Sequence, residues 1–212
     1  MSLPSINLNQ VPLGQFINFM KLLDELKPDF EKRFPEGSRP TLSDILTQYP
    51  EYVEKIVCFW TGWDGIKNKD FDLVLGVYSL IEAHTKFPEP EMIRSFELEG
   101  ETYFAPQDLK AISKTVPMGK ATFGQMLEAL QLEQLANGKY DMMPFVLASL
   151  FTKAGESVDD FDMQERGELF KQLPVTTAIS AYFFLSNFAS TSTKHISNFL
   201  TERATQKQVR PA

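Results

Sequence analysis

The sequence predicts a mainly α-helical protein, with helices in bundle-like domains and one short β-hairpin. Apolar residues recur at three- and four-residue steps over most of the 212 residues, which is the pattern of helices with one buried face. Capping residues, prolines and glycines separate these segments. Only the stretch around 96–104 alternates apolar with polar residues as a half-buried strand pair does.

The first helix follows an arm that contains two prolines, and its apolar stripe consists of Leu13, Phe16, Met20 and Leu23. Pro28 and the Pro-Glu-Gly turn at 35–37 are expected to end this helix. The next helix should begin after Thr41, because Thr41 and Asp44 can both accept hydrogen bonds from free amides of its first turn.

Two further helices are predicted before residue 87. Pro50 fits the first turn of a helix over 51–60, since proline lacks only an amide that has no partner there. Gly62 and Gly65 follow that helix, and an amphipathic helix covers 71–84. The proline- and acid-containing segment 86–91 is the best domain boundary. It divides the chain into an N-terminal helical subdomain, 1–87, and a subdomain with the hairpin and the C-terminal helices, 88–212.

The hairpin prediction depends on the alternation from Phe96 to Glu99 and on Gly100, which separates these residues from Thr102, Tyr103 and Phe104. An isolated hairpin is marginal in water. It must therefore pack on the helices or be completed by a strand from another chain.

The C-terminal half is predicted to be helical again. Thr122 and Gln125 signal a helix that ends at Asn137-Gly138. Pro144 lies in the first turn of the next helix, and residues 155–157 are expected to end it. The acidic loop 159–162 then leads into a helix over 163–173. The longest helix is expected at about 175–201.

The charge balance and the single cysteine narrow the class of protein. A formal charge of −7, from 28 acidic and 21 basic residues, argues against a nucleic-acid binder, which neutralises phosphates with clustered cations. The most apolar stretch, 178–189, is too short for a membrane helix. Cys58 cannot form an internal disulfide and no basic leader opens the chain, so an intracellular, reducing setting is expected.

No residue pattern indicates a catalytic, cofactor or metal site. His84, His195 and Cys58 are too few and too scattered for a zinc site, and no nucleophile elbow, P-loop or dinucleotide motif occurs. Cys58 lies in an apolar helical run, which favours a buried structural thiol over a nucleophile.

Two acidic patterns have a simpler interpretation than chemistry. Asp160 and Asp162 have the spacing of a calcium loop, but Glu165 stands where the loop requires glycine, so we interpret them as carboxylates at a helix start. The acidic residues of the hairpin alternate with apolar ones and are expected on its solvated face rather than in an active site: Glu97, Glu99 and Glu101.

The end of the chain, 194–212, is basic, with Lys194, Arg203, Lys207 and Arg210 against Glu202 alone. It is either a solvated helix end or a tail that docks on the acidic region 156–168 of a neighbouring subunit.

Three stretches resemble small tailed-bacteriophage proteins encoded among virion and tail-assembly genes. The first is Pro-Thr-Leu-Ser-Asp-Ile-Leu at 40–46 with Tyr-Pro-Glu-Tyr-Val-Glu-Lys-Ile at 49–56 and Phe-Trp-Thr-Gly at 59–62. The second is the hairpin, 96–106, with Ala-Thr-Phe-Gly-Gln at 121–125. The third is Leu-Ala-Ser-Leu-Phe at 147–151 with Gly155-Glu156, Arg166, 169–170, 173–174 and 183–185.

This resemblance implies a non-enzymatic structural protein of the virion, at the neck, tail or baseplate, that is assembled in the host cytoplasm and contacts other phage structural proteins. A tail-assembly chaperone that is not retained in the particle is the alternative. We expect homo-oligomers that form through apolar surface and exchange of the hairpin or tail. The candidate interface residues are Phe96, Leu98, Tyr103, Lys207 and Arg210.

Two other classes stay open. A small hydrolase that uses carboxylates requires acidic residues clustered in a pocket with raised pKa values. A regulator that binds a helical peptide requires an open apolar groove between the Phe-rich C-terminal helices.

Overall fold

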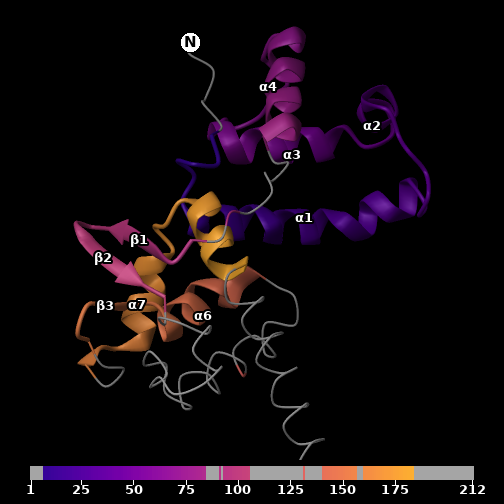
Figure 1. The fold of residues 1–212 in the computed structure, drawn as a ribbon. Coiled ribbons are helices and arrows are strands. Elements are labelled where there is room, and N and C mark those ends of the chain that lie inside the picture. Colours follow the sequence, from indigo (N-terminus) through magenta and orange to yellow (C-terminus); the bar gives the residue numbers. More distant parts are fainter. Residues whose placement is uncertain are drawn as a thin grey trace, which may run out of the picture.

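The computed structural model describes residues 7–84, 91, 93–105, 131, 140–156 and 160–183. The protein is mainly helical and carries a small antiparallel sheet, as predicted (Figure 1). Its elements are α1 (Leu13–Arg33), α2 (Leu42–Gln48), α3 (Pro50–Thr61), α4 (Phe71–His84), β1 (Ser95–Leu98), β2 (Glu101–Phe104), the short 3₁₀ helix η2 (Tyr140–Met142), α6 (Met143–Leu150), β3 (Thr152–Lys153) and α7 (Met163–Phe170).

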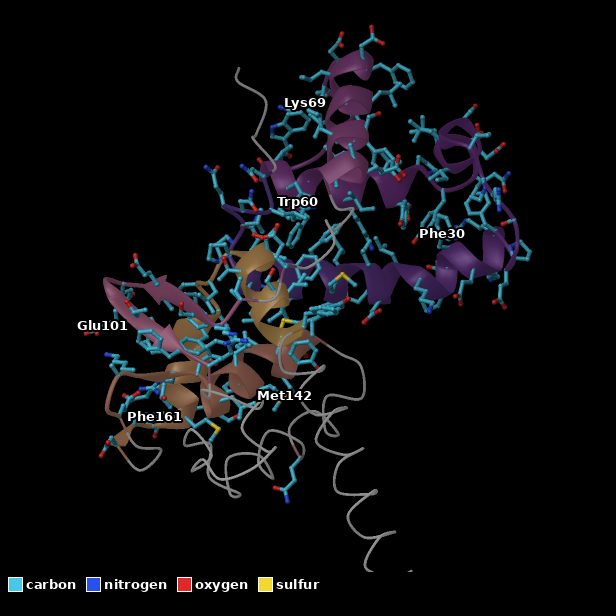
Figure 2. All side chains as sticks on the ribbon, viewed as in Figure 1. Phe30, Trp60, Lys69, Glu101, Met142 and Phe161 are labelled. Atoms are coloured by element: carbon cyan, nitrogen blue, oxygen red, sulfur yellow. The ribbon has the colours of Figure 1, made fainter. Side chains whose placement is uncertain are left out.

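The long helix α1 lies in the middle of the molecule. Figure 1 shows α2, α3 and α4 on one side of it and the sheet with α6 and α7 on the other. The Trp60 ring of α3 packs on Phe19 of α1 with the ring centroids 5.1 Å apart, and Figure 2 places Trp60 between these two helices. On the other side, Phe16 of α1 meets Tyr140 of η2 at 5.4 Å. One hydrophobic core therefore runs through both halves of the described chain.

The start of α1 is held by a segment about 160 residues later in the chain. Pro12 provides no side-chain cap. Instead, the Leu13 amide donates to the carbonyl of Leu173 (2.7 Å) and the Gly14 amide to that of Lys171 (2.8 Å). The first amides of a helix lack partners within it, so these carbonyls replace a cap. Described residues on both sides of the predicted domain boundary thus share hydrogen bonds, and the division into subdomains stays a prediction.

The capping residues predicted to begin and end helices in the first half of the chain are confirmed. Thr41 and Asp44 form a complete capping box at α2, in which the Asp44 amide donates to Thr41 Oγ1 (3.2 Å) and the Thr41 amide to Asp44 Oδ2 (2.8 Å). Pro50 is the first residue of α3, and Gly62 ends that helix in the left-handed conformation with φ 69°. The bounds of α4 match the prediction.

The prediction that Pro28 ends the first helix is wrong, because α1 continues through Pro28 to Arg33. A proline inside a helix costs about 3 kcal/mol, since it removes one hydrogen bond and crowds the preceding turn. Packing of the last turn offsets this cost. The Phe30 ring packs on the rings of Phe34 and Tyr52, with centroid distances of 4.9 and 4.8 Å. The Arg33 guanidinium lies 4.3 Å from the centre of the Tyr49 ring.

In the second half, α6 begins with Pro144 in its first turn as expected. The helix α7 ends at Phe170, three residues before its predicted end, and Lys171 begins a turn. Residues 175–183 are helical, as predicted. The remainder of the helix predicted to 201, and nearly all of the one predicted between Thr122 and Asn137, lie outside the described residues.

Two glycines in helices give a matched test of this packing. A Cβ on Gly167 of α7 would lie 2.5 Å from Cε1 and 3.0 Å from Cγ of Phe145 on α6, whereas a Cβ on Gly76 of α4 would meet nothing within 4 Å. We expect Gly167→Ala to lower the free energy of unfolding by about 1–3 kcal/mol through overpacking. Gly76→Ala should raise it by about 0.5–1 kcal/mol, because alanine is the better helix former.

Urea denaturation followed by circular dichroism measures both changes, and Gly76→Ala serves as the control for the Gly-to-Ala exchange itself. Equal stabilisation by the two substitutions would contradict the close packing of α6 on α7.

Candidate interaction surface

The hairpin that carries the predicted interface residues is built by a two-residue turn. Leu98 pairs with Glu101, and the residues between them, Glu99 and Gly100, have φ of 51° and 79°. A turn with two positive φ values matches the right-handed twist of the flanking strands. Glycine adopts this conformation readily, whereas a residue with a side chain does so at a cost.

Phe96 and Tyr103 face each other across the hairpin and lie on its inner side. Their rings stack with the centroids 5.6 Å apart. Both rings also contact the Phe170 ring of α7, with centroid distances of 5.3 Å for Phe96 and 4.9 Å for Tyr103. Only 6% of Phe96 and 2% of Tyr103 is exposed. The apolar area of these two residues is therefore buried within the chain itself.

The other predicted interface residues differ in their positions. Leu98 is half-buried near the hairpin tip. Lys207 and Arg210 lie outside the described residues. The role of all five residues in an interface remains a prediction, and the described members that are buried support the fold of their own chain.

The hairpin is completed by the chain's own third strand, which the sequence analysis missed. β3 pairs with β2 through Tyr103 opposite Lys153 and Phe104 opposite Thr152, so the strand order is β1-β2-β3. Two residues are too short to show alternation, and β3 follows α6 with only Phe151 between them. Sequence pattern alone therefore could not reveal it.

A buried arginine lies under this sheet and was also not predicted. Arg166 of α7 is 7% exposed and forms an ion pair and hydrogen bond with Glu156. Its guanidinium carbon lies 3.3 Å from the centre of the Phe161 ring and 5.5 Å from that of Tyr103. Figure 2 shows Phe161 on the side of the sheet where α7 lies. We call Arg166, Glu156, Phe161 and Tyr103 the arginine cluster.

Glu156 is positioned for this pair by a tight turn after β3. Gly155 has φ 78°, the Glu156 amide donates to the Lys153 carbonyl (3.2 Å), and the Lys153 amide donates to Glu156 Oε2 (2.9 Å). Burial alone raises the pKa of the Glu156 carboxyl, but the hydrogen bonds from Arg166 and Lys153 and their positive charges hold it below its ordinary value. The cluster thus ties β3 and its turn to α7.

The acidic positions have structural roles or lie in solvent. Glu97, Glu99 and Glu101 are exposed as predicted, and Glu101 pairs with Lys153 at 3.4 Å. Asp162 caps α7 by accepting from the Glu165 amide (3.0 Å), which confirms the helix-start interpretation for Asp162. Among the described residues, no group of three or more His, Cys, Asp or Glu side chains could hold a metal ion.

Cys58 is half-buried rather than fully buried. Burial, followed by the negative charges of Glu54 and Asp64, raises the pKa of its thiol. A raised pKa leaves less of the nucleophilic thiolate at neutral pH. None of the helices within the described ranges is long and apolar enough to span a bilayer.

The chain matches no protein-family model, no curated protein and no solved structure.

The arginine cluster predicts a strong effect of removing one partner. Arg166→Met leaves the Glu156 carboxylate without its cation in a mostly buried position and should lower the free energy of unfolding by about 3–5 kcal/mol. The double variant Arg166→Met with Glu156→Gln removes both charges and should recover a large part of this loss. Urea unfolding curves of the two variants measure the difference, and additive losses would contradict the pairing.

The same pair predicts a pH dependence. The folded-state pKa of Glu156 lies below its ordinary value of 4.5, so the pair stabilises the fold fully above that value. This stabilisation is lost as the pH falls through the folded-state pKa. We expect the stability difference between the wild type and Glu156→Gln to be constant from pH 7 to about pH 5 and to shrink at lower pH. A difference that grows on acidification would contradict this sign.

Proposed function

We propose that this protein is a non-enzymatic structural component of a tailed-bacteriophage particle, at the neck, tail or baseplate, and that it acts through contacts with other proteins. The three stretches that resemble such proteins supply the phage assignment. The observation that carries the non-enzymatic part is the use of the buried polar groups. In the described part of the chain the buried polar or charged residues are Ser149 and Arg166, which bond to the Val146 carbonyl (2.8 Å) and to Glu156. Two buried side-chain nitrogens, Trp60 Nε1 and Arg166 Nη1, have no hydrogen-bond partner among the described residues.

The hydrolase alternative has less support in the described residues. A carboxyl group that works as a general acid near neutral pH needs a raised pKa. The pKa of Asp44 is instead lowered, chiefly by its hydrogen bond with Thr41. Burial raises the pKa of Glu156, but its contacts with Arg166 and Lys153 outweigh burial and lower it. The exposed carboxylates of the hairpin lie in solvent rather than in a pocket.

The peptide-groove alternative requires apolar side chains that line an open surface. Of the Phe-rich helix predicted at 175–201, Phe183 is 38% exposed and the part after it lies outside the described residues. Near the sheet, Phe170 of α7 and Phe151, which follows α6, are 0% exposed. They form part of the protein's own core, which supports a scaffold rather than a groove.

Mass spectrometry of purified particles tests the proposal. Virions of the phage that encodes this chain should contain the protein at a constant ratio to the other structural proteins through successive purification steps. Its presence in infected cells but absence from particles would instead support the tail-assembly chaperone. Absence from particles together with hydrolysis of a small substrate by the purified protein would overturn the proposal.

A further inference from the structure

Among the residues that the structure describes, no strand pairs with the outer edge of β1. Because the sheet has the order β1-β2-β3, β1 is an edge strand. The Ala105 amide donates to the Arg94 carbonyl (2.7 Å). In an antiparallel ladder such pairs alternate, so the backbone amides and carbonyls of Ser95 and Glu97 point away from β2. No backbone hydrogen bond from another described residue reaches these groups.

The edge carries negative charge that the described residues leave unpaired. Residues 91–101 contain four glutamates and one cation, Arg94, which gives a net charge of 1 − 4 = −3. Glu101 has a partner in Lys153, whereas Glu97 and Glu99 are exposed and have no ion-pair partner among the described residues. Beside them, Phe104 on β2 is 36% exposed. An unpaired edge with exposed apolar surface favours pairing with another chain.

The chain itself contains a segment of matching chemistry. Residues 203–210 carry Arg203, Lys207 and Arg210 with no acidic residue. In an extended conformation, successive side chains alternate between the two faces of a strand. Arg210 and Gln208 then share one face, and Lys207 and Val209 share the other.

We propose that the C-terminal tail of a second copy of this protein adds to β1 as a fourth strand. Main-chain hydrogen bonds to Ser95 and Glu97 supply affinity. Arg210 lies on the face of Glu97, and Val209 lies beside the half-buried Leu98. The contact is head-to-tail, because the hairpin of one copy receives the tail of the next, and such contacts build rings or open chains.

This inference deepens the proposed function and rests on it for the expectation that copies of the chain meet in a particle. It also fits the overall charge. A protein of net charge −7 whose only strongly basic end binds an acidic edge has a definite orientation in the assembly.

Charge reversal in the full-length chain tests the contact. The hairpin variant carries Glu97→Lys, at an exposed position, and the tail variant carries Arg210→Glu. Each variant alone places like charges opposite each other and should weaken self-association by about tenfold or more. An equimolar mixture of the two variants should associate again, as should a chain that carries both substitutions. Sedimentation velocity at low salt measures the association.

The variant Ser95→Pro tests the strand geometry without a change of charge. Its proline removes an amide that points away from β2, so the hairpin keeps its ladder, whereas a docked strand loses a hydrogen bond. We expect weaker association and an unchanged circular dichroism spectrum. As a control, Ser95→Ala should associate as the wild type does.

A wild type that stays monomeric at low salt, or variants that associate as well as it does, would overturn the inference. Hydrogen exchange distinguishes a further case, in which the protein stays monomeric but the hairpin amides are protected in the wild type and not in the tail variant. A chain would then bind its own tail, which also overturns the second-copy contact. These outcomes are separate from the virion test, since a monomeric protein found in purified particles would leave the proposed function intact.

Discussion

The fold depends on one non-local constraint, the pairing of 11–14 with 171–175. The amides of Leu13 and Gly14 donate to carbonyls of Leu173 and Lys171, and the Val175 amide donates back to the Val11 carbonyl (2.9 Å). A Cβ on Gly14 would lie 3.2 Å from the Lys171 Cβ, so the two backbones approach closely. This pairing fixes the start of α1, and α1 in turn packs on α3 on one side and on η2 on the other.

The pairing also connects the two kinds of structure in the molecule. The turn that supplies the carbonyls, at Lys171 and Leu173, directly follows α7, and α7 carries Arg166 and Phe170 under the sheet. A change in the position of α7 would therefore affect the cap of α1 and the inner face of the hairpin together. The ion pair of Arg166 with Glu156 restrains α7 near its middle. Burying such a pair adds little net stability, but a broken pair costs several kcal/mol, so its main effect is to define one arrangement.

The sequence predicted the elements whose causes lie within a few residues. The capping box of Thr41 and Asp44, Pro50 at the start of α3 and the turn at Glu99-Gly100 each act through neighbouring backbone groups. The failures have non-local causes. Pro28 stays inside α1 because Phe30 packs on Tyr52, a residue of α3. β3 exists because Tyr103 and Phe104 lie beside it. The partners Arg166 and Glu156 are separated by residues without periodicity, so nothing in the pattern joins them.

The proposed interaction function is compatible with the burial of the most apolar residues of the sheet. Phe96 and Tyr103 attach the hairpin to α7, and this attachment fixes the position of the opposite edge and face. A strand held on one side by stacked rings presents Ser95 and Glu97 in a defined geometry, which lowers the entropy that a partner strand must lose on binding. The buried aromatic residues and the exposed polar edge therefore have complementary roles in the proposed contact. The inner side provides rigidity, and the outer side provides hydrogen-bonding groups and charge.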